Sequence, residues 1–290
     1  MKPAPFRYRA ARSLEEAAAT LAAEGDGAKL LAGGQSLVPM LNFRLVRPAL
    51  LLDLNRIPGL DGIAETAEGL SIGAMARHRA LETSSLVARH FPVLAAAMPL
   101  IAHLAIRNRG TLGGSIAHAD PAAELPMLAL LLDARIHTHT PAGPRTHDAG
   151  SFFVSALATA LRADEIVTRI DLPFLPPGSG WGFEELARRH GDFALAAVAV
   201  TLSAAQGRMR RVRIALMGVG DTPLRAHAAE AALEGAAFGQ DAIAVAVAAL
   251  RAGIAPHGDL HASGDYRRHL AGVLAARALA AAWQRATAAA

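Results

Sequence analysis

The chain of 290 residues contains no cysteine. Disulfide bonds, thiolate zinc sites, cysteine nucleophiles and cysteine-ligated iron-sulfur clusters are therefore excluded within it. Aromatic residues are also scarce, at 4%, so alanine, leucine, valine and isoleucine must fill most of the core. Any redox chemistry that this chain performs needs an organic cofactor.

Long apolar runs and strong net charge are missing as well. The longest apolar stretch, Val93 to Ile106, is too short to span a bilayer and contains His103. Met1 to Ser13 has charges but no apolar signal segment, so we expect a cytoplasmic location. The net charge is only +4, and the arginine cluster at 208–213 runs into an alternating strand, which favours a solvated hairpin face. We expect neither nucleic acid nor a membrane as a partner.

Two double-glycine segments are the most informative feature that is present. They are Leu31-Ala32-Gly33-Gly34-Gln35-Ser36 and Thr111-Leu112-Gly113-Gly114-Ser115, each placed where an apolar run ends. Glycine permits tight turns and lets an anion approach main-chain N–H groups directly. Neither segment fits the Rossmann spacing or the P-loop pattern. One such turn is usually only structural, but two with neighbouring hydroxyl residues predict a dinucleotide diphosphate held from two sides.

Capping signals and apolar periodicity predict a mixed α+β chain. The capping box at Ser13 to Glu16 and the stop at Gly25 predict a helix from Leu14 to Glu24. Ser36 is expected to cap a helical turn that runs through Leu41. We expect strands at 29–32, 50–54, 70–74, 135–140 and 165–172, and helices at 83–89, 92–103 and 125–132.

The proline- and glycine-rich stretch at 173–178 is the predicted domain boundary. Beyond it we expect three strands at 182–188, 193–204 and 210–218, and helices at 225–233, 241–253 and 266–285.

Polar residues outside the glycine segments have alternative interpretations. Asp120 and Glu124 could accept hydrogen bonds from ribose or ribityl hydroxyls, or could simply start a helix. The loop from Arg188 to Phe193 is, from its residues alone, an ordinary hairpin loop.

Several histidines are spaced closely enough to raise the question of a metal site. They are His137, His139 and His147, and the pair His257 and His261. No carboxylate stands at ligand spacing, so solvated faces are favoured over zinc, and we predict no metal site.

Five segments occur in an order that identifies a family. They are 32–39 (AGGQSLVP), 106–115 (IRNRGTLGGS), 118–126 (HADPAAELP), 183–192 (FEELARRHGD) and 266–274 (YRRHLAGVL). Together they closely resemble the FAD-binding medium subunit of molybdenum hydroxylases, the carbon monoxide dehydrogenase and xanthine dehydrogenase family. The resemblance spans nearly the whole chain.

The resemblance implies an α+β fold with two domains. Residues 1–176 would form a two-lobed FAD-binding domain of the vanillyl-alcohol-oxidase (PCMH) type, with lobes at about 1–58 and 59–176. Residues 177–290 would form a smaller C-terminal α/β domain of the carbon monoxide dehydrogenase flavoprotein type. That domain would carry a three-stranded antiparallel sheet with helices and would pack against the isoalloxazine ring.

The same resemblance implies an FAD site. Its diphosphate and adjoining sugar would contact Ala32, Gly33, Gly34, Gln35 and Ser36 together with Thr111, Leu112, Gly113, Gly114 and Ser115. Ile101 and Val167 would supply apolar contacts to the flavin or adenine, and Glu124 an acidic contact.

Two further positions gain a role from the resemblance. Glu184 stands where some xanthine-oxidising relatives carry a lysine near the flavin, and a glutamate there would oppose an anionic reduced ring. The loop from Arg188 to Phe193 would cover the flavin face, with Phe193 as its apolar cover. No residue is expected to act as an acid or base catalyst.

The implied function is electron transfer in an oxidoreductase. Substrate would be hydroxylated at a molybdenum cofactor in a large subunit, and electrons would cross iron-sulfur clusters in a small subunit to FAD in this chain. NAD, a quinone or oxygen would then accept them, and two three-subunit units would pair as a dimer of heterotrimers.

Two alternatives remain open. One is a stand-alone FAD-dependent oxidase or dehydrogenase of the same fold, and the other is a nonenzymatic interaction module whose basic hairpin binds an acidic partner.

Overall fold

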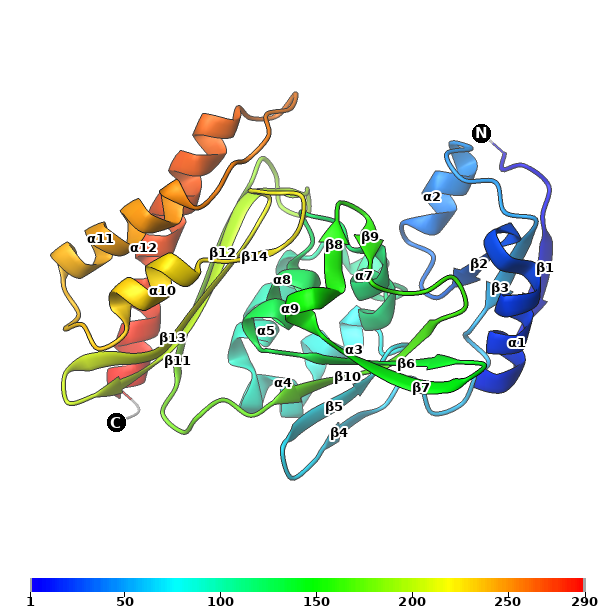
Figure 1. The fold of residues 1–290 in the computed structure, drawn as a ribbon, viewed down its shortest axis with the longest axis horizontal. Helices are drawn as coiled ribbons and strands as arrows, with labels where there is room; N and C mark the ends of the chain where they lie inside the picture. The colour runs from blue at the N-terminus through cyan, green and yellow to red at the C-terminus, as the bar shows by residue number, and fades with distance from the viewer. Residues whose placement is uncertain (1, 289–290) are drawn as a thin grey trace.

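The computed structural model describes residues 2–288 as three consecutive parts that lie in a row. In Figure 1 a small N-terminal lobe lies at one end, a larger second lobe in the middle, and a C-terminal part of sheet and helices at the other end. We use first lobe for β1 to β3, second lobe for β4 to β10, and C-terminal part for β11 to α12.

The first lobe is a three-stranded parallel sheet with the order β1-β3-β2. Its elements are β1 (Arg7–Ala10), α1 (Leu14–Glu24), a 3₁₀ turn (Gly25–Gly27), β2 (Ala28–Leu31), α2 (Leu37–Asn42) and β3 (Leu50–Asp53). Helix α1 has its predicted bounds because the Ser13 hydroxyl accepts a hydrogen bond from Glu16 N at 3.1 Å and Gly25, at φ +52°, ends it.

The second lobe combines a five-stranded antiparallel sheet, in the order β4-β5-β10-β6-β7, with a group of short helices. The strands are β4 (Ile63–Glu65), β5 (Gly69–Gly73), β6 (Arg135–Thr140), β7 (Gly143–Asp148) and β10 (Ile166–Pro173), with a separate hairpin of β8 (Phe153–Ser155) and β9 (Ala158–Thr159). The helices are α3 (His78–Thr83), α4 (Ser85–His90), α5 (Pro92–Ala97), a 3₁₀ turn (Met98–Leu100), α6 (Leu104–Arg107), α7 (Leu112–His118), α8 (Glu124–Leu131) and α9 (Ala149–Phe152).

The single helix expected at 92–103 is wrong. Helix α5 ends at Ala97, and the chain then makes a 3₁₀ turn and passes through Ala102 at φ +47°. Pro99 explains the break, because it cannot donate the main-chain hydrogen bond that a continuing helix requires. The consequence for the site is that Ile101 lies in a bend and not on a helix.

The C-terminal part is a four-stranded antiparallel sheet, β11-β12-β13-β14, with three helices. Its elements are β11 (Gly180–Ala187), β12 (Ala194–Ala205), β13 (Arg208–Met217), β14 (Leu224–Arg225), α10 (His227–Leu233), α11 (Gln240–Ala252) and α12 (Gly264–Ala288). The expectation of three strands missed β14, whose two residues pair with Ala215 and Leu216, and the helix expected from Arg225 begins two residues later. A two-residue strand carries no periodicity, so only its pairing defines it.

The sheet of the C-terminal part is covered on both faces. On one face, a Cβ on Gly182 would stand 2.8 Å from Ala278 Cα, so the glycine lets α12 lie directly on β11. On the other face, Ala197, Ala199 and Ala215 belong to the same buried apolar cluster as the helices of the second lobe. Small side chains therefore bring the sheet close to α5 and α8, and this boundary borders the candidate site.

Within residues 2–288, no helix is long and apolar enough to cross a membrane.

Candidate functional site

The first glycine segment connects β2 to α2. Gly34 has φ +74°, a conformation that favours glycine, and the Gln35 side-chain amide donates to Gly33 O at 2.9 Å. Ser36 precedes α2 but makes no side-chain capping bond, so the expected cap is wrong although the helix forms. The segment is a sharp turn whose Ser36 hydroxyl is not used by the helix that follows.

The second glycine segment forms the first turns of α7 and not a free loop. Thr111 caps this helix by accepting a hydrogen bond from Gly114 N at 3.1 Å. Gly113 is required because a Cβ there would stand 2.8 Å from Ala74 O, while its own N–H donates to that oxygen at 2.8 Å. The segment is therefore fixed against the chain that follows β5.

A buried histidine is hydrogen-bonded to the start of the second glycine segment. His78 N donates to Gly110 O at 2.9 Å, and its ring Nε2 lies 3.0 Å from Thr111 O. Burial lowers the pKa of His78 to about 4, so the ring is neutral at physiological pH and Nε2 donates to that carbonyl. Sequence reasoning missed His78, because nothing local connects it to a segment 33 residues away.

The two glycine segments touch each other across the two lobes. A Cβ on Gly33 would overlap Arg109 O and stand 2.8 Å from Gly110 Cα, and a Cβ on Gly114 would stand 3.7 Å from Ala32 Cβ. Glycine at position 33 lets the first segment lie directly against the main chain that leads into the second, and Gly114 and Ala32 stand in ordinary contact distance, as a diphosphate gripped from both directions requires. The sequence-based pairing of the segments thus has a spatial counterpart.

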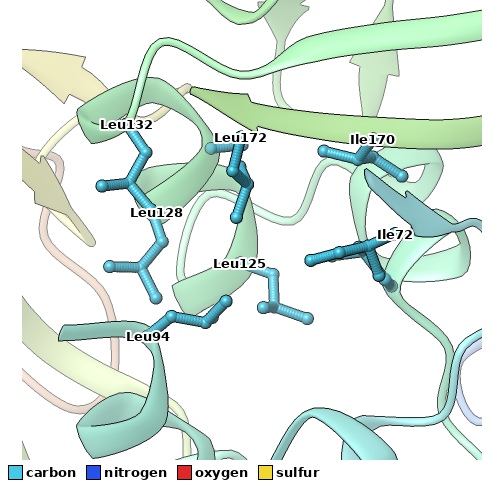
Figure 2. A pocket seen from close by; sticks show the side chains of 9 residues that line it. Ile72, Leu94, Leu125, Leu128, Leu132, Ile170 and Leu172 are labelled. Carbon is cyan, nitrogen blue, oxygen red and sulfur yellow. The ribbon is translucent and has the colours of Figure 1, made fainter. Parts of the chain in front are cut away.

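Leu112 serves the core of the second lobe. It is one of nine apolar residues that line a small cavity of about 10 Å³, seven of which are labelled in Figure 2. A space of that size holds at most one water, and its apolar walls offer that water no partner. The pocket in Figure 2 is a packing defect of the core and not a ligand site.

Ile101 and Val167 are both buried in the core of the second lobe, at 8% and 7% exposure. The bend at Ile101 is held by Arg107, whose Nη1 donates to Ile101 O at 3.0 Å and to Ala102 O at 3.1 Å. Arg107 is in turn paired with Glu82, with Nε 2.9 Å from Oε2. Sequence reasoning missed this pair, which fixes where the expected flavin contact stands.

Glu124 begins α8 and is almost fully buried, at 8% exposure. Burial, with a smaller contribution from Asp120, raises the pKa of Glu124 to about 7. Burial and the charge of Glu124 also raise the pKa of Glu185, on β11, to about 8. Glu185 Oε2 is buried with no hydrogen-bond partner among the described residues. Two carboxyl groups thus lie close enough to interact electrostatically where the second lobe meets the C-terminal part.

Glu184 lies on the opposite face of β11 from Glu185. Alternation along the strand puts Glu184 on the same side as Gly182, toward α12, while Phe183 and Glu185 point toward the second lobe. The structure therefore brings Glu185, and not Glu184, to the other predicted site residues. The alternation of Trp181, Phe183 and Glu185 in the sequence already indicates that Glu185 shares a strand face with two aromatic residues.

The loop between β11 and β12 reaches the bend of the second lobe. Gly191, at φ +85°, lies so close to His103 that a Cβ there would stand 2.7 Å from its Nδ1. Phe193 remains 70% exposed. The loop expected to cover the flavin thus rests beside the segment that carries Ile101.

Two of the histidines considered for metal binding are paired with carboxylates. His147 Nε2 lies 2.7 Å from the buried carboxylate of Glu165, and His137 Nε2 lies 2.7 Å from Asp171. Over residues 2–288, no group of three or more His, Asp or Glu side chains is placed to hold a metal ion.

Both domains of the chain match known protein families. Residues 4–175 match the family described as FAD binding domain in molybdopterin dehydrogenase, and residues 181–282 match the CO dehydrogenase flavoprotein C-terminal domain. The chain belongs to this flavoprotein family. The sequence-based assignment to FAD-binding medium subunits of molybdenum hydroxylases is confirmed, and so is the α+β fold.

Similar proteins match nearly the whole chain. The 6-hydroxypseudooxynicotine dehydrogenase complex subunit alpha of Paenarthrobacter nicotinovorans is 44% identical over 99% of this chain and 97% of its own. The carbon monoxide dehydrogenase medium chain of Hydrogenophaga pseudoflava is 41% identical over 98% of this chain and 99% of its own. These flavoproteins are subunits of oxidoreductases, as predicted for this one.

Solved structures agree with the fold. The carbon monoxide dehydrogenase structure from Hydrogenophaga pseudoflava superposes with a TM-score of 0.96 at 44% identity, covering 98% of this chain and 99% of the other. Quinoline 2-oxidoreductase from Pseudomonas putida 86 gives a TM-score of 0.94 at 40% identity, covering 99% of this chain and 100% of the other. FAD is the cofactor of this flavoprotein, as the family assignment states, and the touching glycine segments fit its diphosphate.

Proposed function

We propose that this flavoprotein is the electron-transfer subunit of a three-component molybdenum hydroxylase. In this assembly a small subunit carries iron-sulfur clusters and a large subunit carries the molybdenum cofactor. The absence of cysteine supports the division, because this chain cannot hold the clusters itself. Bound FAD would take up electrons from the clusters and release them to NAD, a quinone or oxygen.

The contact between the two glycine segments is the observation that carries the proposal. Gly33 lies directly against the backbone of Arg109 and Gly110, and Gly114 lies beside Ala32, so the main chains of both lobes come together where one anionic group would bind. We assign the diphosphate and adjoining sugar to residues 32–36 and 111–115, although Leu112 contributes there only through its place in the turn. These residues bind and orient the cofactor; none of them moves a proton.

Other residues would shape the rest of the site. We propose that Ile101 and Val167 border the apolar part of the cofactor and that Glu124 accepts from its hydroxyl groups. We propose that Glu185, and not Glu184, supplies the second acidic group of the site, because it lies on the face of β11 that borders the second lobe and feels the charge of Glu124. Phe193, in its exposed loop, would shield the ring from water.

The proposed domains divide near residue 176, with lobes meeting near residue 58. The segment between β10 and β11 contains Pro176, Pro177 and Gly178, which supports a linker there. We further propose that two three-chain units pair as a dimer of heterotrimers. The cytoplasmic location stays a prediction.

Reconstitution with FAD tests the binding part of the proposal. Purified chain titrated with FAD should bind one equivalent and turn yellow, while Gly34→Val and Gly114→Val should lose the cofactor. Gly27→Ala is a matched control, because a Cβ there would meet only Ala49 Cβ at 4.0 Å. Colourless chain after saturation with FAD would contradict the proposal.

Isolation of the native complex tests the electron-transfer part. Tagged chain should co-purify with a cysteine-rich iron-sulfur chain and a molybdenum-containing chain, and light scattering should give the mass of two three-chain units. Substrate turnover by the FAD-loaded chain alone would instead establish the stand-alone oxidase. The rate at which NAD, a quinone or oxygen reoxidises the reduced complex identifies the acceptor. The nonenzymatic alternative is set aside by the family assignment.

A further inference from the structure

Two polar side chains outside the glycine segments connect those segments to each other. Asn55 follows β3 in the first lobe, and its Nδ2 donates to Ala32 O at 2.9 Å. Arg77 precedes α3 in the second lobe, and its Nη2 donates to Asn55 Oδ1 at 2.6 Å. Arg77 Nη1 also donates to Arg109 O. A chain of three hydrogen bonds therefore runs from the carbonyl of one segment to the carbonyl beside the other.

Both ends of this chain lie where the lobes touch. Ala32 is the neighbour of Gly114, and Arg109 is the neighbour of Gly33. Thr111 forms an isolated β-bridge with Arg77, so the main chain at Arg77 is fixed to the second segment as well. Any change in the length of the hydrogen-bond chain would therefore move one glycine segment relative to the other.

The amide of Asn55 is oriented by a buried carboxylate. Asp53 Oδ1 accepts from Asn55 N at 2.8 Å and from Asn55 Nδ2, and Asp53 Oδ2 accepts from Tyr8 OH at 2.6 Å. Burial opposes ionisation of Asp53, but the hydrogen bonds from Tyr8 and Asn55 lower its pKa overall. An ionised Asp53 attracts the NH₂ group of Asn55 and leaves Oδ1 to face Arg77.

Arg77 is suited to the bridging position. A guanidinium group offers several N–H donors in a rigid plane, so one side chain reaches two acceptors on different lobes. Arg77 is half-buried, and burial together with the nearby positive charge of Arg109 lowers its pKa, while it stays protonated. An anion held between the segments would relieve the repulsion between these two arginines.

We propose that Asn55 and Arg77 are positioning residues that hold the two lobes at the separation that the FAD diphosphate requires. We call the pair the lobe latch. It acts through the carbonyl of Ala32 in the first glycine segment and the carbonyl of Arg109, two residues before the second, and contributes to affinity by keeping the site formed before the cofactor arrives. The inference rests on FAD as the cofactor of this chain.

A double-mutant cycle on cofactor affinity tests the lobe latch. Asn55→Ala and Arg77→Ala should each weaken FAD binding by about tenfold, the order expected for loss of a hydrogen bond to a charged group. Because each substitution breaks the same chain, the double variant should be about as weak as either single variant, not about a hundredfold weaker. Arg77→Lys should fall between Arg77→Ala and the unsubstituted chain, since a single ammonium replaces the planar fork.

The same titrations with ADP locate the effect. ADP carries the diphosphate without the flavin, so its affinity should fall by the same factor as that of FAD. Titrations well below the unfolding transition report on folded chain only, and thermal unfolding without cofactor reports separately on stability. Arg56→Ala is the matched control, because it removes an exposed positive charge next to Asn55 outside the hydrogen-bond chain, and it should stay within about twofold.

Three outcomes would overturn the lobe latch. They are unchanged FAD affinity in Asn55→Ala, a double variant whose loss equals the product of the single losses, and loss of FAD affinity without loss of ADP affinity. If Asn55→Ala left FAD affinity unchanged while Arg77→Ala weakened it, only the positive charge of Arg77 would contribute to FAD binding. If the unsubstituted chain bound no FAD, the proposed function would fail; if it bound FAD and all variants bound equally, only the latch would fail.

Discussion

Replacing Gly33 by alanine separates the requirement for a turn from the requirement for contact between the lobes. Gly33 has no positive φ, so alanine causes no backbone strain there. Its Cβ, however, would stand 2.8 Å from Gly110 Cα and 3.0 Å from Arg109 C. Ordinary carbon contacts are about 3.5–4.0 Å, so the two main chains must separate by roughly 0.5–1 Å.

The Cβ of Gly33→Ala would clash with backbone atoms, so no change of side-chain rotamer can relieve the clash. Overpacking of this kind costs about 1–3 kcal/mol. If the lobes separate to relieve it, the cost falls on cofactor binding, and FAD affinity should drop roughly 5- to 150-fold. If they do not, the same cost falls on the free energy of unfolding.

The assay pairs a fluorescence titration of FAD with thermal unfolding of the cofactor-free chain. Gly27→Ala, in the same lobe, should leave both measurements close to those of the unsubstituted chain, since its Cβ would meet only Ala49 Cβ at 4.0 Å. A Gly33→Ala chain with unchanged FAD affinity and unchanged unfolding temperature would refute the contact between the lobes.

Two further substitutions test other parts of the molecule. The pKa values of Glu185 and Glu124 are raised to about 8 and about 7, so the folded chain keeps protons that the unfolded chain loses near pH 4.5. The free energy of unfolding should therefore fall as the pH rises from about 5 to 8. Glu185→Gln should flatten this dependence in denaturant unfolding, and an equally steep slope in the variant would contradict the raised pKa of Glu185. Gly182→Val would drive a side chain into the backbone of α12 and should cost about 1–3 kcal/mol or more in unfolding free energy. Gly239→Ala, where a Cβ meets nothing within 4 Å, should be neutral in the same denaturant unfolding, and equal unfolding free energies of both variants would argue against close packing of α12 on β11.

Local signals predicted local structure well. Helix α1 has its expected bounds because a hydroxyl cap and a glycine stop lie within a few residues of its ends. The buried strand β3 was equally readable from its run of leucines. One prediction failed because the deciding contact lies elsewhere: β14 exists only because it pairs with Ala215 and Leu216. Another failed on a local signal that the apolar pattern outweighed, because Pro99 divides the segment that was expected to be one helix.

The choice between Glu184 and Glu185 shows the same limit at the site. Resemblance to relatives pointed to Glu184, yet adjacent residues on a strand face opposite sides. Which side faces the second lobe depends on α12 lying against Gly182, about 96 residues later in the chain. One residue of register thus decides which carboxyl group borders the site.

By itself, the sequence determined the chemical inventory of this flavoprotein: no cysteine for clusters, two glycine segments for a diphosphate, and flanking residues specific enough to name the family and FAD. Only the tertiary structure decided that the chain around the two glycine segments comes together, that Asn55 and Arg77 connect it, and that Glu185 lies near enough to Glu124 to feel its charge. The physical reason is the separation along the chain of the residues whose contacts decide each feature. Composition and turn chemistry are properties of neighbouring residues, whereas a site between lobes is made by contacts between distant segments, which packing of the whole chain sets.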